Sequence, residues 1–473
     1  MLTRLRVSGF KNLDNVDLSF GPFSCIAGPN GVGKSNLFDA ISLLSDLSHR
    51  TVIEAMTSVR GTNGRISEVG RLFTSTKDGP IPAMLFVADM VVPRSVRDDY
   101  DRPETATATF LEYTLELRFN ANRTDSANAG PVYIEREELR AKPSSDAAKS
   151  LPFNPGKAWI KKYVFGPGPR KNPFISTVQG LNAEPTIRLL GDKSPGRPIG
   201  VPARKSPQTV LSGVNEATSP TALTVRNELR SWRLLQLEPS ALRRPDELRS
   251  QSQVSAIGAH LPAALLRIGS NAEVAQRLAD LIPGVISVDV ATDSVRETKT
   301  LEVRLRDKKA YSASSLSDGT LRFLALAILA SDPDAGGLIC MEEPENGIHP
   351  LRIPDMLKLV RALADVDEAE EQQGGREVLR QVIINTHSPL VVGVLPNDEL
   401  LMAETLRFRG REFMGFKPLR GTWRAKLAAQ GVGDVVSRGE LAAYLGESSI
   451  ATAKSSTKRL VRDDLTPDMF EIR

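Results

Sequence analysis

The sequence predicts an α/β fold that combines a parallel sheet with a lobe of antiparallel strands, and three observations lead to this prediction. Near the start of the chain, a short apolar strand runs directly into a glycine-rich turn and a helix (residues 24–47). Residues 315–389 alternate helix, strand, helix and strand, which is typical of a parallel sheet. Residues 82–139 contain three longer segments with the alternation of half-buried strands.

The composition indicates a folded protein of roughly two to four domains or lobes. The chain has 473 residues, of which 41% are apolar and 25% charged, and these values exclude an intrinsically disordered chain. It has neither an apolar run of about 18 residues nor a secretory signal, so we expect a cytoplasmic protein without a membrane partner. Two cysteines and four histidines are too few for a disulfide framework or a zinc site, so Cys25 and Cys340 should be buried thiols.

The first half of the chain reads mainly as strands. Residues 2–10 and 16–20 alternate apolar and polar side chains. Residues 24–27 form a short apolar strand, and the helix after it has apolar positions at helical spacing, namely Leu37, Ile41, Leu44 and Leu47. Further strands are expected at residues 82–92, 106–119 and 131–139.

The second half mixes helices and hairpins. Ser270 and Glu273 have the spacing of a capping box ahead of a helix that runs to residue 281. The segments 284–290 and 300–306 alternate and predict one hairpin, and a second hairpin is expected at 400–419 with its turn at Gly410. The remaining helices are expected at residues 221–237, 260–268 and 423–445, followed by a polar tail after residue 448.

Basic charge is concentrated in residues 151–210. This segment has ten Lys or Arg residues against only Glu184 and Asp192, whereas the whole chain has a net charge of +4. It also holds ten prolines and seven glycines, a composition that does not propagate helix or sheet. A basic, irregular insertion could bind the phosphates of a nucleic acid, and a solvated linker is the alternative.

Residues 28–35 read GPNGVGKS and match the pattern G-x-x-x-x-G-K-[ST]. Glycines in such a loop let successive backbone N–H groups turn inward toward phosphate oxygens, and the following helix points its positive end at them. The lysine of the pattern, Lys34, reaches the β- and γ-phosphates, and the hydroxyl of Ser35 binds Mg²⁺. A strand before the loop and an amphipathic helix after it supply the required context.

Four apolar residues at 338–341 run into two carboxylates, Glu342 and Glu343. Buried parallel strands read this way, and ligands bind at their carboxyl ends. The first carboxylate can hold Mg²⁺ through water, and the second can orient or deprotonate an attacking water. An acid pair alone is weak evidence, but together with the phosphate-binding loop it predicts a nucleoside triphosphate hydrolase.

Three further segments resemble motifs of one ATPase class. Residues 316–320, LSDGT, resemble the signature motif of ABC ATPases. Residues 344–350, PENGIHP, look like the D-loop region of that class, and residues 385–389, NTHSP, resemble its switch-histidine loop. Together with the opening GFKN at residues 9–12, these motifs are similar to the soluble branch that contains RecF, SMC proteins and OLD-type ATPases. Within it they most resemble stand-alone bacterial ATPases.

This resemblance implies an ABC-type P-loop ATPase head with a mixed sheet, an antiparallel β lobe and a helical or irregular insertion. The ATPase core would comprise residues 1–60 and 300–400, the inserted lobe residues 61–299, and a hairpin, helix and tail residues 401–473. ATP and Mg²⁺ would be the ligands. The phosphate loop of one subunit and the signature motif of another would share each ATP, so a head-to-tail homodimer or a larger homo-oligomer is expected.

The resemblance also implies residue roles. Glu342 would serve Mg²⁺, Glu343 would polarise water and His387 would sense the γ-phosphate. Asn346 would lie near the dimer seam. The signature residues Ser317, Asp318 and Gly319 would act on the nucleotide of the second subunit. The nucleotide would be bound by Gly28, Pro29, Asn30, Gly31, Val32, Gly33, Lys34, Ser35 and Asn36.

The sequence departs from the wider class in three places. Glu342 stands where aspartate is commoner, so its division of labour with Glu343 stays open. Asp318 and Thr320 replace a glycine and a glutamine of the signature motif. No glutamine after the first helix is recognisable as the Q-loop residue that contacts Mg²⁺ and water.

Two functions remain open on sequence grounds. One is a regulatory ATPase, typical of bacterial anti-phage defence, that controls a separate effector such as a nuclease. The other is a DNA repair or recombination ATPase of RecF type that acts on DNA directly. The chain continues only to Arg473 after His387, so no nuclease activity is expected in cis. A scaffold with an inactive site is disfavoured because four residues of the expected site are present together: Lys34, Ser35, Glu343 and His387.

Overall fold

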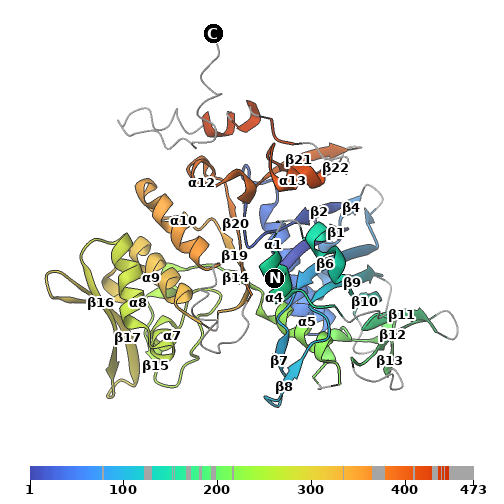
Figure 1. The fold of residues 1–473 in the computed structure, drawn as a ribbon, viewed down its shortest axis with the longest axis horizontal. Coiled ribbons are helices and arrows are strands. Elements are labelled where there is room, and N and C mark those ends of the chain that lie inside the picture. Colours follow the sequence, from blue (N-terminus) through green and yellow to red (C-terminus); the bar gives the residue numbers. More distant parts are fainter. Residues whose placement is uncertain are drawn as a thin grey trace, which may run out of the picture. The chain divides into compact units, whose positions relative to one another are not determined.

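The structure is a computed structural model of the chain (Figure 1). Its described residues form two compact units. Unit 1 comprises Met1–Gly21, Gly28–Trp232 and Leu401–Val435, and unit 2 comprises Pro22–Ala27, Arg233–Leu400 and the described residues from Val436 onward. The described residues are 1–76, 79–121, 130–151, 153, 155–166, 172–180, 184–192, 199–215, 218–333, 335–364, 379–408, 411–428, 435–437, 439–441 and 443–446.

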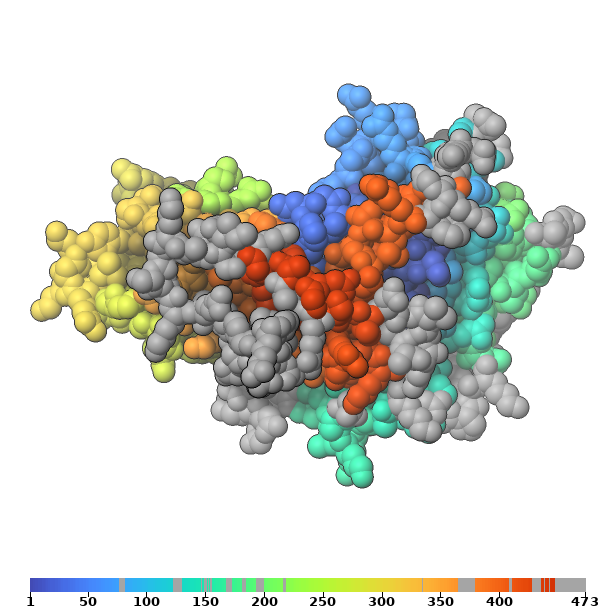
Figure 2. Space-filling view, turned by 90° about the horizontal axis from the view of Figure 1, so that it is seen from above, coloured from blue at the N-terminus to red at the C-terminus, as the bar shows by residue number. Residues whose placement is uncertain are grey.

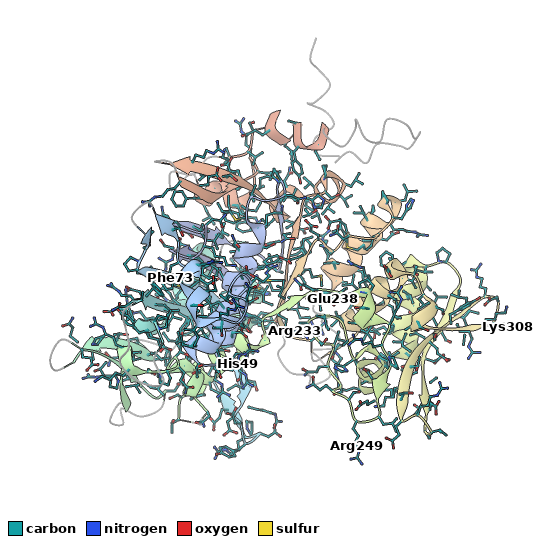
Figure 3. All side chains as sticks on the ribbon, turned by 180° about the vertical axis from the view of Figure 1, so that it is seen from behind. His49, Phe73, Arg233, Glu238, Arg249 and Lys308 are labelled. Carbon is teal, nitrogen blue, oxygen red and sulfur yellow. The ribbon has the colours of Figure 1, made fainter. Side chains whose placement is uncertain are left out.

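An eight-stranded antiparallel sheet organises unit 1, with the strand order β13-β12-β11-β10-β9-β6-β1-β2 (Figure 1). Its apolar side is filled by aromatic rings, such as the edge-to-face pair Phe10 and Phe86 at 5.7 Å and the pair Phe73 and Phe119 at 5.3 Å; Phe73 is labelled in Figure 3. The strands are β1 (Leu2–Ser8), β2 (Val16–Ser19), β6 (Ala83–Val91), β9 (Phe110–Phe119), β10 (Val132–Ala141), β11 (Ile175–Gln179), β12 (Pro185–Leu189) and β13 (Ile199–Pro202).

The basic segment 151–210 corrects a prediction. It was expected to form neither helix nor sheet, yet β11, β12 and β13 extend the large sheet by three antiparallel strands. Each strand is only four or five residues long, and prolines occupy strand ends, as at Pro185 and Pro202, where a missing N–H is tolerated. The segment therefore adds ordered structure to the sheet and also contains the short helix α4 (Lys157–Tyr163). Helix α3 (Ala147–Ser150) ends just before it.

Unit 1 also contains helices, a hairpin and several short strands. Helix α1 (Lys34–Leu47) buries Leu37, Ile41 and Leu44, as its spacing predicted. Helix α2 (Val52–Ser58) begins with a capping box between Thr51 and Glu54. The hairpin of β21 (Leu400–Phe408) and β22 (Arg411–Pro418) is confirmed, and its expected turn at Gly410 lies outside the described residues. The remaining elements are β4 (Ser75–Thr76), β5 (Gly79–Pro80), β7 (Ser95–Arg97), β8 (Pro103–Thr105), α5 (Pro220–Ser231) and α13 (Trp423–Ala428).

Unit 2 contains the predicted parallel strands. They run in the order β14-β19-β20-β3, with β3 (Phe23–Ala27) paired to β20 (Arg380–Thr386), β20 to β19 (Gly337–Glu342) and β19 to β14 (Arg233–Leu235). All seven residues of β20 and the first five of β19 are buried. Burial on both faces explains the apolar run of β19 and the central Val-Ile-Ile of β20, which also buries the polar side chains of Gln381 and Asn385. Cys25 and Cys340 are buried on two of these strands and form no disulfide with each other, as expected.

Helices and a small antiparallel sheet complete unit 2. Helix α9 (Asp318–Ala330) precedes β19. Helix α10 (Ile353–Ala362) packs against α9. The predicted hairpin is confirmed as β16 (Val285–Asp293) and β17 (Thr298–Leu305), yellow in Figure 2, and its tip is exposed at Val295. Lys308, labelled in Figure 3, lies in the turn after β17. The remaining elements are β15 (Asp246–Glu247), β18 (Ala310–Ser312), α6 (Pro239–Leu242), α7 (Leu261–Ile268), α8 (Asn271–Leu281) and α12 (Pro389–Val394).

Several predicted boundaries are wrong. The helix expected at 221–237 ends at Ser231, and the chain continues as strand β14. Ser270 precedes α8 as expected, but its side chain makes no capping hydrogen bond. Glu273 binds Arg277 and Ser331. The helix expected at 423–445 is interrupted: α13 ends at Ala428, residues 435–437 are not helical, and residues 439–441 and 443–446 are helical again. The tail after residue 448 lies outside the described residues. No helix in the described part of the chain is long and apolar enough to cross a bilayer.

Candidate functional site

The phosphate loop leads directly from β3 into helix α1. Gly31 and Gly33 have φ values of 82° and 100°, in the left-handed region that glycine occupies without strain. Pro29, Asn30 and Gly31 are exposed at the loop tip, while Lys34 is buried. The Lys34 Nζ atom donates hydrogen bonds of 2.7 Å to the carbonyl oxygens of Gly28 and Pro29, so the loop closes around its own lysine.

The amide of Asn12 holds the back of this loop. Its Nδ2 donates to the Val32 carbonyl at 3.0 Å, and its Oδ1 accepts from Asn36 Nδ2 at 2.8 Å. A Cβ atom added at Gly33 would lie 2.3 Å from Asn12 Nδ2, so only glycine fits there. The expected nucleotide-binding residue Asn36 is therefore bonded to Asn12, from the opening motif GFKN.

The carboxyl ends of three parallel strands in unit 2 lie side by side. Glu342, the last residue of β19, pairs in register with Asn385 of β20, and Thr386 pairs with Ala27, the last residue of β3. The phosphate loop begins at the next residue, Gly28, and His387 follows Thr386 directly. Strand register therefore brings the predicted acidic pair and the predicted histidine to one edge of the sheet.

Glu343 is the most constrained residue of this edge. Its φ of 43° lies in the left-handed region, which costs a non-glycine residue of order 1–3 kcal/mol and is typical of functional sites. The Asn385 side-chain and backbone oxygens both accept its N–H, at 3.1 Å. Its Oε1 lies 2.7 Å from Nδ1 of His387, and its Oε2 accepts a 2.8 Å hydrogen bond from Asn346. The structure thus brings together three predicted residues: Glu343, His387 and Asn346.

Gln236 is a site residue that sequence reasoning missed. It follows β14, between Arg233 and Glu238, which are both labelled in Figure 3, and its Nε2 donates to Glu342 Oε2 at 3.0 Å. The expected Q-loop glutamine was sought after the first helix, far earlier in the chain. In the sequence, Gln236 is marked only by its place after the three-residue strand β14. That strand continues the helical pattern of α5 and was therefore not recognised.

Glu345 was also missed. Its side chain is buried and accepts a hydrogen bond from the Thr386 hydroxyl, and its other oxygen, Oε2, is buried without a partner among the described residues. Burial raises the pKa of Glu345, and the nearby Glu343 carboxylate acts in the same direction. Only the repeated acids of residues 342–345 hinted at this position, because burial cannot be read from a polar tetrapeptide.

The predicted signature residues form the start of helix α9. Ser317 is the N-cap, and its Oγ accepts the Thr320 N–H at 3.2 Å. Asp318 lies 2.5 Å from Arg243, which also donates to the Leu316 carbonyl at 3.0 Å. Gly319 lies near the D-loop segment, since a Cβ added there would be 3.6 Å from the Gly347 carbonyl oxygen. Ser317 and Asp318 are exposed and accessible to another molecule.

The donor groups suit a nucleoside triphosphate with Mg²⁺. Mg²⁺ keeps several waters and takes one or two protein oxygens plus substrate phosphates, rather than an all-protein cage. Within the described residues, no group of three or more His, Cys, Asp or Glu able to hold a metal occurs. The Glu342 carboxylate and the Ser35 hydroxyl are oxygen donors of the required kind, and the phosphate loop offers N–H groups and the Lys34 ammonium to an anion.

A glycine-rich loop ahead of α1 and carboxylates at the ends of parallel strands define a P-loop ATPase. A family model described as "AAA domain, putative AbiEii toxin, Type IV TA system" matches residues 23–97 and 209–393, more than half of the chain. The chain belongs to this family, and it is an ABC-type ATPase of the RecF, SMC and OLD branch with the α/β head fold.

Short segments of curated proteins are similar to this chain. An OLD nuclease from Thermus scotoductus is 48% identical over 44 residues, covering 9% of this chain and 8% of the nuclease. The DNA replication and repair protein RecF from Magnetococcus marinus is 51% identical over 45 residues, covering 9% and 12%, and RecF from Erwinia tasmaniensis is 32% identical over 78 residues, covering 16% and 22%. The chain therefore matches less than a quarter of each relative's length.

Solved structures of SMC heads align with this chain with TM-scores below 0.5. An SMC head bound to the C-winged helix domain of ScpA aligns with a TM-score of 0.46 and 14% identity, covering 88% of this chain and 98% of that one. The SMC head domain from Thermotoga maritima has a TM-score of 0.38 and 12% identity, covering 89% and 99%. The family assignment rests on the family match and the site motifs rather than on these scores.

Proposed function

We propose that the chain binds and hydrolyses ATP, dimerises head to tail when ATP binds, and uses this cycle to regulate a separate effector protein. The observation that carries the proposal is the contact between Glu343 and His387, 2.7 Å apart on a strained backbone. The Glu343 carboxylate is held by the His387 ring and the Asn346 amide at the end of a buried strand. A carboxylate fixed in this way is a candidate for orienting the attacking water.

Each residue role follows from its chemistry. Lys34 would exchange its two carbonyl partners for phosphate oxygens, which are stronger acceptors for an ammonium group. Ser35 and Glu342 would bind Mg²⁺, and the amide of Gln236, already 3.0 Å from Glu342, would fix the orientation of that carboxylate. Glu343 would hold the water, and His387 would orient Glu343 and respond to the γ-phosphate. The Mg²⁺ ion would neutralise charge on the β- and γ-phosphates.

The proposed dimer depends on the signature residues. Ser317 and Asp318 are exposed at the N-terminal end of α9, where the helix dipole favours anions. In a head-to-tail pair they would reach the nucleotide held by the partner, so ATP would bind the closed pair more tightly than the open one. Hydrolysis removes this preference, and the pair then opens.

The test uses Glu343→Gln, which keeps the size of the side chain but removes the charge. This variant should bind ATP and Mg²⁺ as the natural protein does, hydrolyse at least a hundredfold more slowly, and accumulate as a dimer in sedimentation velocity. The matched control is Glu297→Gln, because Glu297 is an exposed glutamate that also has a positive φ, 53°. A Glu343→Gln variant that stays monomeric with ATP and Mg²⁺ would contradict the composite site.

For the biological role we propose bacterial anti-phage defence, with a nuclease or similar effector supplied in trans and no nuclease activity in this chain. The family description names a toxin of a type IV TA system, which supports a role in defence. The match to the OLD nuclease covers 8% of that protein and supports no more than the shared ATPase motifs. Purified protein with ATP and Mg²⁺ should leave DNA intact, and hydrolysis should change when the product of a neighbouring gene is added.

A RecF-type role on DNA is the second candidate. It is favoured by the 32–51% identity of short segments to RecF proteins and by the exposed lysines Lys157, Lys161 and Lys162 of helix α4 in the basic segment. Under this alternative, duplex DNA should stimulate ATP hydrolysis. The affinity of the protein for DNA should fall roughly 10³-fold between about 50 and 200 mM salt, because several phosphate contacts each release counterions. Replacing the three lysines by alanine should remove the stimulation.

A further inference from the structure

His387 stands next to a hydrogen-bonded link to the buried residue Glu345, to which the sequence motifs give no role. His387 lies between Thr386 and Ser388, and one hydroxyl binds both sides of it. The Thr386 Oγ1 atom donates to Glu345 and accepts the N–H of Ser388 at 2.9 Å. The backbone on both sides of the histidine is therefore tied to the same point.

Glu345 is the fixed end of this chain of hydrogen bonds. Its exposed fraction is 7%, and it belongs to the segment that follows β19, whereas Thr386 belongs to β20. A buried carboxyl group costs free energy unless its partners compensate, and here one oxygen has a partner and Oε2 has none among the described residues. Because burial of this carboxyl group is unfavourable, stability alone does not account for its place here.

We propose that Glu345 is a positioning residue for ATP hydrolysis, which holds His387 against Glu343 through the hydroxyl of Thr386. The inference rests on the proposed function of Glu343 and His387. Glu343 and Glu345 flank Pro344, so the two segments are joined twice: by Glu343 with His387 at 2.7 Å, and by Glu345 with Thr386. Without the contact between Glu345 and Thr386, the segment around His387 could rotate about its contact with Glu343.

The test compares two substitutions at Glu345 that differ in one property. Glu345→Gln keeps a carbonyl oxygen that accepts from Thr386, and Glu345→Leu has a similar volume without an acceptor. We expect the glutamine variant to retain the natural kcat, and the leucine variant to lose about ten- to hundredfold in kcat with an unchanged KM for ATP. Thr386→Val should reproduce the leucine effect, Thr386→Ser should not, and the double variant Glu345→Leu with Thr386→Val should lose no more than either alone.

A second measurement does not depend on hydrolysis. The chain has four histidines, so the ring nitrogens of His387 can be followed by NMR of the histidine-labelled protein and assigned with His387→Gln. Glu345→Leu should shift the His387 signals and leave the other three unchanged, and Glu345→Gln should shift none. If the natural protein does not hydrolyse ATP, the proposed function fails, yet the NMR signals still decide the link. Unshifted His387 signals in Glu345→Leu, or equal losses in kcat and ATP affinity, would overturn the positioning role.

Discussion

The side-chain amide of Gln236 lies 3.0 Å from Oε2 of Glu342, across 106 residues of sequence. The contact exists because β14 and β19 are parallel and paired, so both residues emerge at the carboxyl edge of the same sheet. We propose that Gln236 is the glutamine that the sequence motifs left unassigned. A carboxylate that binds a metal through one oxygen is commonly oriented through the other, and Gln236 is in position to do this.

Replacing Gln236 by leucine should therefore weaken the binding of Mg²⁺ at the nucleotide site. We expect the Mg²⁺ concentration for half-maximal hydrolysis to rise about ten- to hundredfold, the usual cost of losing a partner of a metal ligand. The measurement is the rate of phosphate release across a Mg²⁺ titration. Gln253→Leu is the control, because Gln253 is exposed on a loop of unit 2. Equal Mg²⁺ dependence in the two variants would show that Gln236 does not orient Glu342.

Lys34→Ala should abolish nucleotide binding. The buried ammonium of Lys34 carries the charge of the phosphate loop, and alanine would also leave the carbonyls of Gly28 and Pro29 without their donor. Binding of a fluorescent ATP analogue should become undetectable, while Lys308→Ala, which removes an exposed lysine of a turn, should bind normally. Natural affinity in Lys34→Ala would refute the assignment of the phosphate loop.

Arg243→Ala should affect association rather than stability. Its ion pair with Asp318 is partly exposed, so the free energy of unfolding should change by less than about 1 kcal/mol. Since Arg243 also binds the Leu316 carbonyl, its loss should loosen the segment before Ser317 and weaken ATP-dependent dimerisation several-fold, as measured by sedimentation. The control is Arg277→Ala, which removes a similarly exposed pair on α8. Equal dimerisation in both variants would count against a role for Arg243 in positioning the signature motif.

Glu137 should make unit 1 sensitive to pH. Burial raises the pKa of this carboxyl from 4.5 to about 7, against hydrogen bonds donated by Leu211, Val210 and Tyr113 that favour the charged form. Between these two values the folded state holds a proton that the unfolded chain has released, so stability falls as pH rises from about 4.5 to 7. The contribution is on the order of 1–3 kcal/mol.

The check is the difference in melting temperature between the natural protein and Glu137→Gln as a function of pH. Glutamine does not titrate and loses one acceptor, so the variant should be less stable at pH 5, and the difference should shrink toward pH 8. A difference that grows with pH would mean that Glu137 is charged in the folded protein.

How much the sequence could predict depended on the length of each signal. The phosphate loop, strands β19 and β20 and the β16–β17 hairpin were recognisable because each combines a pattern of several residues with its context. Strand β14 was not, since three residues carry no periodicity and continue the apolar spacing of α5. Strands β11 to β13 were missed because their prolines read as breaks, although prolines are tolerated at strand ends. The burial of Glu345 depends on Thr386, a partner from a distant strand, and no local pattern encodes that.

Strand β3 belongs to unit 2, although the residues before and after it belong to unit 1. Its neighbour β20 contributes Val382 opposite Phe23, so the ribosome must add most of the chain before this pair can form. At about 5–20 residues per second, β3 waits roughly 20–70 s for its neighbour. Until β20 has been synthesised, the apolar segment β3 lacks this neighbour, and an unpaired strand edge of this kind is prone to misassembly.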